Sequence, residues 1–466
     1  MTPAEMSPVE ISPVEMSQIE AQARRWAALL RAPKSAHLTF YVAVAMSIVV
    51  YYLAGRHQGF TRDDWASLIS RQNARRVSGV NDFLNRPQDG HWLAVPEVLY
   101  LAARNAFGLG SYWPFLIPTL VAHVATVLLI RVLCLRHGVS AWTTTLVCSM
   151  LLVFGSGWQN LVFAIQISFN LSLLAFFAQL VLVDHDGPVD RRDYLGAVLV
   201  LFGVMSSGFG PIFMVGIFVV LALRQRWKAL VVALAPQVVL YAWWYLTWVL
   251  DAKGGVPTGN RSLLPVFVTR GISATFDGLT ALPGLGAIAI VGTLVVALSR
   301  RFGWRTQSLL VALVTTVCVM YALVGFERLG LGIQFATEAR YVYVAGLVIA
   351  PVFGLAVDQL GRIARELRWA GLAVLCLAIG TNLSLLVDGS NRWANGTAGE
   401  RHTFELIAGS GLAGQADPRR TIFTDSPDVT PGAIADLVAR GALDPIPPVT
   451  PADKQIVSNA LGIPVP

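Results

Sequence analysis

Long apolar runs separated by short polar loops dominate the hydrophobic pattern of this chain. A run of roughly 17–25 residues is long enough to cross about 30 Å of hydrocarbon as a helix. Lipid offers backbone N–H and C=O groups no partner, so each such run is expected to close its own hydrogen bonds as an α-helix. The expected membrane spans lie near residues 38–54, 113–133, 141–155, 161–183, 229–250, 283–299, 306–325, 341–358 and 369–387.

One further apolar stretch, between Arg192 and Arg224, is interrupted by a Ser-Ser-Gly-Phe-Gly-Pro sequence at residues 206–211. Basic residues flank both ends, and basic loops tend to stay in the cytoplasm, so the chain must turn back at the break. Each half has only ~14–16 residues, about 21–24 Å of helix, so we expect the turn to lie inside the protein. Counted as two helices, this hairpin completes the prediction of an all-α polytopic bundle of about 11 transmembrane helices.

The composition agrees with a membrane protein. Of the 466 residues, 55% are hydrophobic and 14% are charged, whereas soluble domains carry about a quarter charged residues. A net charge of +7 would suit a nucleic-acid partner, but the basic residues gather in the short loops between spans. They are therefore expected to set topology in contact with membrane lipids, and no nucleic-acid partner is expected. The four cysteines lie far apart and show no metal-ligand spacing.

The pattern divides the chain into three parts. Residues 1–36 are polar and broken by prolines, which predicts a disordered cytoplasmic leader. Residues 37–390 hold the spans and form the transmembrane domain, and residues 391–466 form a small extracytoplasmic tail. The topology predicts a multi-pass protein of the cell inner or plasma membrane, with a cytoplasmic N-terminus and an extracytoplasmic C-terminus.

Two long outer loops are predicted, at residues 55–112 and 251–282. In the first loop, residues 96–107 carry apolar positions at helical spacing, interrupted by Glu97 and Arg104. This pattern is typical of an interfacial helix that lies along the membrane surface.

Charged and ionisable residues are scarce inside the spans and gather at their predicted outer ends. An ion-coupled transporter would place carboxylates nearer the bilayer midplane. The distribution therefore favours an enzyme that acts on something presented at the membrane surface. The gathered residues are Asp63, Asp64, Asp89, His91, Glu97, Glu327, Arg328, Glu338 and Arg340.

The adjacent pair Asp63 and Asp64 follows the first span directly. Two neighbouring carboxylates at a partly desolvated boundary repel each other, which raises a pKa toward the range of a general base. An aspartate placed just before the sequence Trp-Ala-Ser-Leu-Ile is equally suited to cap a helix N-terminus. Spacing alone does not choose between these two roles.

Three other positions carry candidate binding groups. His91 and Trp92 can stack on a sugar ring or anchor the loop at the membrane interface. Arg340, next to Tyr341, can hold a phosphate through two parallel hydrogen bonds, or pair with a neighbouring carboxylate. Gln166 can line a pocket or bond another helix. The chain has no glycine-rich phosphate loop, so no nucleotide cofactor is expected.

Taken in order, Asp63-Asp64-Trp65, Gly90-His91-Trp92 and Ala339-Arg340-Tyr341 resemble the motifs of the GT-C superfamily of membrane glycosyltransferases. The bacterial branch that is similar to protein mannosyltransferases is the nearest in shape. The broken hairpin at residues 206–211 and the segment 158–166 also look like that group. The resemblance covers about residues 38–390.

This resemblance implies an inverting transfer of one sugar from a polyprenyl-phosphate donor to an extracytoplasmic glycan, lipid or protein acceptor of the cell envelope. It implies Asp63 or Asp64 as the general base and Arg340 on the lipid phosphate, joined by Arg328 or Arg62. Some members of the superfamily need a divalent cation and others do not. Candidate metal ligands in this chain are Asp89 and His91.

Two other functions stay open at this stage. A transporter or flippase would move a lipid-linked sugar without cutting it. An envelope assembly protein could keep the same fold without the chemistry, because a fold does not guarantee an activity.

Overall fold

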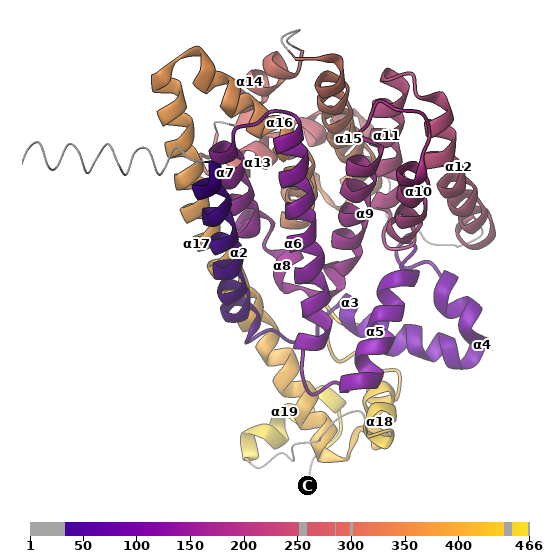
Figure 1. Ribbon diagram of the computed structural model, residues 1–466. Helices are drawn as coiled ribbons and strands as arrows, with labels where there is room; N and C mark the ends of the chain where they lie inside the picture. Colours follow the sequence, from indigo (N-terminus) through magenta and orange to yellow (C-terminus); the bar gives the residue numbers. More distant parts are fainter. Residues whose placement is uncertain (1–32, 251–258, 285, 299–301, 442–449, 465–466) are drawn as a thin grey trace, which may run out of the picture.

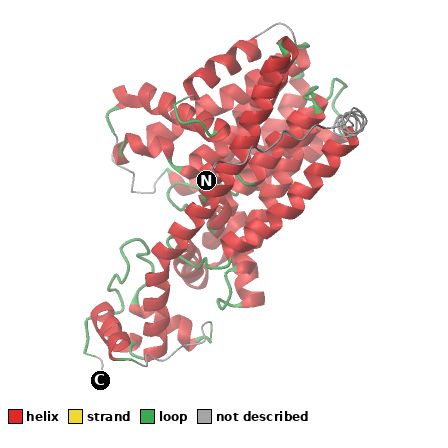
Figure 2. Ribbon diagram, turned by 90° about the vertical axis from the view of Figure 1, so that its left-hand side faces the viewer, coloured by secondary structure: helices red, strands yellow, loops and turns green. Residues whose placement is uncertain are grey.

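The computed structural model describes residues 33–250, 259–284, 286–298, 302–441 and 450–464 (Figure 1). Throughout these residues the secondary structure is helical, apart from one isolated bridge between Gln88 and His91. A long bundle forms the upper part of the molecule, and a smaller group of helices hangs below it (Figures 1 and 2). Most of the predicted leader lies outside the described residues, and helix α2 begins at Pro33.

Seven helical segments are long and apolar enough to cross a membrane. The predicted count of about 11 is not confirmed, but each remaining predicted span corresponds to a shorter helix of 12 to 15 residues. The seven segments correspond to α2 (Pro33–Gly55), α6 (Trp113–Arg136), α9 (Ile167–Val183), α12 (Trp227–Trp244), α15 (Trp304–Arg328), α16 (Ala339–Ile363) and α17 (Arg365–Ser410). The shorter helices are α7 (Ala141–Leu152), α10 (Arg191–Val204), α11 (Phe209–Leu223) and α14 (Gly286–Leu298).

Helices α10 and α11 form the expected hairpin, with its turn buried inside the protein. Ser206 and Ser207 at the turn are almost inaccessible to solvent. The Ser206 hydroxyl donates to the carbonyl oxygen of Phe202 at 2.5 Å, and the Ser207 hydroxyl accepts from the amide of Phe209 at 3.2 Å. Serine side chains thus satisfy backbone groups that the break in the helix frees.

The segment predicted as a second outer loop, 251–282, contains a helix that the sequence pattern did not reveal. Helix α13 (Leu264–Thr280) buries Phe267 and Phe276. Its Thr275 hydroxyl lies 2.8 Å from the hydroxyl of Tyr321 on α15. Polar residues interrupt the apolar positions of α13, so hydropathy alone assigned this stretch to a loop.

The first loop, 55–112, folds against one end of the bundle, which we call the loop end. It consists of α3 (Asp63–Trp65), a π-helical turn (Ala66–Ser70), α4 (Arg71–Asn85) and α5 (Ala94–Phe107). Helix α5 matches the predicted interfacial helix and begins two residues earlier. One face of α5 buries Glu97 and Tyr100, while Phe107 stays exposed.

Helix α17 continues far beyond the bundle at the loop end. Its 46 residues make about 69 Å of helix, more than twice the thickness of a bilayer core. The boundary predicted at residue 390 therefore falls inside one continuous helix. Around the projecting half lie α18 (Pro431–Ala439) and α19 (Pro451–Leu461), at the bottom of Figure 1.

Candidate active site

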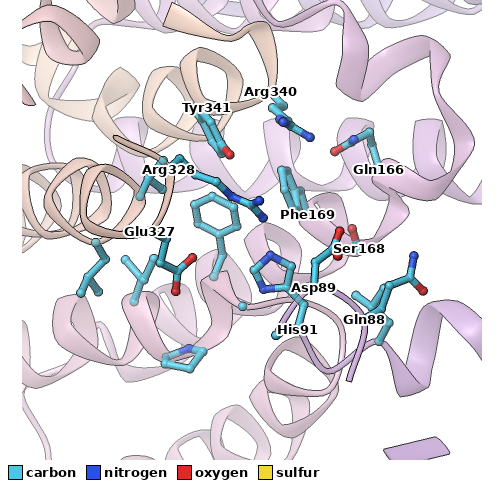
Figure 3. A pocket seen from close by; sticks show the side chains of 18 of the residues that line it. Gln88, Asp89, His91, Gln166, Ser168, Phe169, Glu327, Arg328, Arg340 and Tyr341 are labelled. Atoms are coloured by element: carbon cyan, nitrogen blue, oxygen red, sulfur yellow. The ribbon is translucent and has the colours of Figure 1, made fainter. Parts of the chain in front are cut away.

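A single cavity at the loop end collects most of the residues singled out from the sequence. It lies between the first loop, the α10–α11 turn and the facing ends of α15 and α16, and its volume is about 200 Å³. Figure 3 shows the guanidinium groups of Arg328 and Arg340 directed into the space near Tyr341, His91 and Gln166. The polar lining consists of Asp63, Gln88, Asp89, His91, Gln166, Ser168, Tyr241, Glu327, Arg328, Arg340 and Tyr341.

Asp63 and Asp64 point to different environments because successive residues of a helix face different directions. Asp63, the first residue of α3, lines the cavity. Asp64 is completely buried behind it and accepts hydrogen bonds from the hydroxyls of Tyr100 and Tyr112 and from the amide of Thr61. Asp64 therefore ties α3 to α5 and α6, while Asp63 stays available to a ligand.

The pKa values of both carboxyls are raised. Burial raises the pKa of Asp63 and the charge of Asp89 adds to this, while Arg340 and Arg62 oppose it. Burial raises the pKa of Asp64 to about 7, against the hydrogen bonds that it accepts. A carboxylate that is partly withdrawn from water is a stronger base, which suits Asp63 for taking up a proton.

His91 reaches the cavity on a tight turn. Gln88 and His91 exchange two backbone hydrogen bonds of 3.0 and 2.8 Å across Asp89 and Gly90. Both central residues have positive φ, 49° and 78°, as the two-residue turn of type I′ requires. His91 packs over Gly208 of the α10–α11 turn, where any side chain would collide with its Nδ1 atom. Burial, helped by the charge of Arg328, lowers the pKa of His91 to about 4, so its ring is neutral.

Arg340 stands in the first turn of α16 with its guanidinium carbon 5.2 Å from the centre of the Tyr341 ring. Its Nε atom is buried and has no hydrogen-bond partner in the described part of the chain. Among the same residues, neither Arg340 nor Arg328 has a carboxylate within ion-pair distance, and Glu338 does not pair with Arg340. Although the carboxylates of Asp63, Asp89 and Glu327 line the same cavity, neither guanidinium group is held in a direct ion pair by the described residues, so both can hydrogen-bond to an anion.

Three residues predicted as candidates do not line the cavity. Asp64 is one of them. Trp92 is buried and stacks on Trp244 of α12, with ring centres 5.2 Å apart and planes within 2°. Its indole N–H donates to the carbonyl of Leu84 at 2.9 Å, so Trp92 joins the first loop to the bundle. Arg62 turns away from the cavity and donates to Asp425 at 3.0 Å.

Several lining residues were not predicted from the sequence. Ser168 and Phe169 follow a 3-10 turn (Ala164–Gln166) that interrupts the span predicted over residues 161–183, and nothing in the sequence singled them out. Tyr241 and Leu323 lie inside long apolar helices and had no signal at all. The lining residues that the sequence did not single out are Gln88, Leu93, Ile165, Ser168, Phe169, Ile212, Tyr241, Leu323 and Val324.

The candidate metal ligands Asp89 and His91 both line the cavity. The described residues do not bring a third histidine, cysteine or carboxylate to ligand spacing with these two. Such a group of three does occur elsewhere, near the opposite end of the bundle, where its two carboxylates already bind arginine side chains. Its members are His185, Asp190 and Asp193.

Comparison with known proteins gives a match in structure alone. No protein-family model matches the chain, and no curated protein matches it in sequence. The crystal structure of ArnT from Cupriavidus metallidurans bound to undecaprenyl phosphate matches with a TM-score of 0.52 at 12% identity, over 91% of this chain and 89% of that one. The same protein in its apo state matches with a TM-score of 0.54 at 10% identity, over 91% and 88%.

This chain has the GT-C fold. The fold that the motif resemblance implied is thereby confirmed. The closer likeness to protein mannosyltransferases stays a prediction. With seven segments long enough to cross a bilayer and the fold of a GT-C glycosyltransferase, the chain is a multi-pass membrane protein.

Proposed function

We propose that this protein is an inverting membrane glycosyltransferase that moves a sugar from a polyprenyl-phosphate donor to an acceptor outside the cytoplasm. The observation that carries the proposal is one cavity shared by the carboxylate of Asp63 and the guanidinium groups of Arg328 and Arg340. The GT-C fold supports it, as does the undecaprenyl phosphate bound to ArnT. The acceptor is a component of the cell envelope.

The topology is part of the same proposal. Basic loops lie on the side opposite the cavity, which favours a cytoplasmic position for that side. The N-terminus then lies inside, and the loop end with its cavity and the tail lie outside the inner or plasma membrane. Lipid-linked sugars presented on that face need no nucleotide, which fits a chain without a nucleotide-binding motif.

In the reaction, the acceptor oxygen attacks C1 of the sugar from the face opposite the lipid phosphate. Asp63 takes the acceptor proton as the new C1–O bond forms. The bond between C1 and the phosphate oxygen breaks, and its electron pair stays on the departing lipid phosphate. Arg340 and Arg328 stabilise the added negative charge there, since fixed cations in a partly desolvated site act strongly on developing charge. Direct displacement inverts the anomeric centre.

The rest of the cavity orients the donor. Apolar side chains, including Ile165, Phe209 and Ile212, line one part of the cavity and suit the first isoprene units of the lipid. The neutral ring of His91 and the amide of Gln166, whose Oε1 is buried without a partner, can bond sugar hydroxyls. Holding the reacting atoms in line supplies a large share of the rate in such reactions.

The first prediction tests the roles of the two aspartates. We expect Asp63→Asn to lower transfer by about 10²–10⁴-fold, because it removes the proton acceptor. Asp64→Asn keeps a side chain that can accept hydrogen bonds, so we expect a smaller loss. Glu405→Gln is a matched control, since Glu405 is a half-buried residue of α17 whose ion pair among the described residues is with Arg401.

Each variant would complement a strain that lacks the gene, and envelope glycans would be compared by mass spectrometry. Purified proteins would be tested for binding of undecaprenyl phosphate. The enzyme proposal requires a glycan that disappears with Asp63→Asn while undecaprenyl phosphate still binds. An unchanged glycan in the Asp63→Asn strain would contradict it and would favour a flippase or an assembly protein.

A further inference from the structure

Side chains of the tail form hydrogen bonds with Thr61 and Arg62, the two residues that precede Asp63. The Thr61 hydroxyl donates to Oε2 of Glu400, on the projecting half of α17, at 3.1 Å. The amide of Arg62 donates to the hydroxyl of Ser426 at 2.8 Å, and that hydroxyl donates in turn to the same oxygen of Glu400 at 3.1 Å. One carboxylate oxygen thus anchors both residues, one directly and one through Ser426.

The backbone held in this way is strained. Arg62 has φ 48° and ψ −120°, a region that costs an L-residue about 1–3 kcal/mol and persists only when the surroundings enforce it. Asp63 follows immediately and begins α3, so the dihedral angles of Arg62 set the direction in which the Asp63 side chain leaves the backbone. Strain at this residue therefore lies next to the group proposed as the base.

Other contacts, from Ser390 on α17 and from the tail, surround the same segment. The ring of Phe404 lies 4.6 Å from that of Trp65, just after Asp63. Before it, the Gln58 amide donates to the carbonyl oxygen of Ser390 at 3.0 Å. Asp425, next to Ser426, binds the Arg62 side chain. The tail therefore holds residues on both sides of Asp63, while neither Glu400 nor Ser426 lines the cavity.

We propose that Glu400 and Ser426 are positioning residues for Asp63, and that the segment 390–426 supports the base from outside the cavity. They fix the strained Thr61–Arg62 backbone so that Asp63 faces the cavity. The inference rests on the proposed function, since it assigns Asp63 as the base. The arginines proposed to bind the donor phosphate, Arg328 and Arg340, lie on α15 and α16. Loss of the hydrogen bonds from Glu400 and Ser426 should therefore displace Asp63 and leave the phosphate-binding site in place.

The test compares removal with conservative replacement at both positions. Glu400→Ala and Ser426→Ala remove the hydrogen bonds to the strained backbone. Glu400→Gln keeps an oxygen that accepts both bonds, and Ser426→Thr keeps a hydroxyl. Glu405→Ala, on the same helix, is the control. For each variant, three quantities would be measured: the transfer rate in membrane vesicles, the Kd for undecaprenyl phosphate and the melting temperature.

We expect both alanine variants to lose about 10–100-fold in transfer rate, as small misplacements of a catalytic group do. Their Kd for undecaprenyl phosphate should stay within about twofold of the wild type, and Glu400→Gln and Ser426→Thr should recover most of the rate. A wild-type rate in Glu400→Ala would overturn the inference. The inference would also be overturned if the transfer rate fell together with the affinity for undecaprenyl phosphate and the melting temperature. That result would indicate a purely structural role for Glu400 and Ser426.

The Asp63→Asn variant separates this inference from the function on which it rests. If Asp63→Asn stays active, the proposed function fails, whatever Glu400→Ala does. If Asp63→Asn is inactive and Glu400→Ala is unaffected, the assignment of the base stands and the positioning role of the tail is rejected.

Discussion

At the scale of single residues, the two neighbouring carboxylates Asp63 and Asp64 have different surroundings and therefore different roles. Asp63 faces the cavity, while its neighbour Asp64 is enclosed by the hydroxyls of Tyr100 and Tyr112. Because the oxygens of Asp64 already accept hydrogen bonds from protein donors, they are not free to accept a hydrogen bond from a substrate. The pair thus divides into a group for proton transfer and a group that fixes the loop.

The charges around Asp63 predict the pH dependence of the reaction. Burial and Asp89 raise its pKa, with a smaller contribution from Asp428, whereas Arg340 and Arg62 lower it. A general base works when it is deprotonated, so the transfer rate should rise with pH through this raised pKa. Asp89→Asn removes the largest repulsive charge on Asp63, so the rising limb of the profile should move to lower pH.

The measurement is the transfer rate in membrane vesicles between pH 4 and pH 8, at saturating donor. Arg340→Gln should have the opposite effect. It removes a positive charge that lowers the pKa of Asp63, so the rising limb of the remaining activity should move to higher pH. A profile that does not move in Asp89→Asn, or that moves upward, would exclude Asp63 as the group that titrates.

At the scale of elements, the α10–α11 turn and the first loop form the cavity by direct contact. The amide of Val95 at the start of α5 donates to the carbonyl of Met205 at 3.1 Å, and His91 packs on Gly208. The absent side chain at Gly208 leaves the space that the imidazole occupies. The hairpin and the loop are therefore matched in shape at this one position.

This contact predicts the effect of Gly208→Ala. The added methyl group overlaps His91 Nδ1, so either the turn or the histidine must move, and we expect a lower melting temperature and a transfer rate reduced about tenfold or more. Gly380→Ala on α17 is the matched control, because nothing lies within 4 Å of the added atom there. In the double variant with His91→Ala, the overlap disappears and the melting temperature should recover. A double variant no more stable than Gly208→Ala would contradict the contact.

The elements also show how far the sequence alone can lead. Membrane spans follow from apolar runs, because lipid requires helices, and the charged residues at span ends pointed to the cavity. The choice between Asp63 and Asp64 depends on Tyr100 and Tyr112, whose positions no local pattern encodes. The structural role of Trp92 likewise depends on Trp244, far along the chain. Helix α13 was missed because its buried face is too short and mixed for a hydropathy signal.

At the scale of the whole molecule, the end of the bundle opposite the cavity is closed by a charged network. Asp184, which follows α9, accepts from Arg224 after α11 and from Arg305 at the start of α15, both at 3.0 Å. His137, after α6, lies 3.4 Å from the same carboxylate. Four helix ends thus meet at one buried side chain. Burial alone would raise the pKa of Asp184, but His137, Arg305 and Arg224 hold it well below the usual range.

The network predicts that Asp184→Asn destabilises the fold without changing the chemistry. A carboxylate whose pKa is lowered by folding stabilises the folded state at every pH above the pKa that it has in the unfolded chain. This stabilisation is lost only as the pH falls through the pKa of the folded state. At neutral pH, Asp184→Asn should lower the free energy of unfolding by about 2–3 kcal/mol. This is less than for a fully buried ion pair, because Arg305 is partly exposed. In detergent, the melting temperature should fall by several degrees and the deficit should persist down to pH 5.

Asp186→Asn is the control, because Asp186 is exposed and its ion pair among the described residues is a 3.5 Å contact with Arg305, at the edge of this network. Its melting temperature should match that of the wild type. The transfer rate per folded molecule should be the same in Asp184→Asn as in the wild type, since none of the network residues lines the cavity. A large loss of rate at unchanged melting temperature would mean that the two ends of the bundle are coupled, and that the fold does more than hold the cavity open.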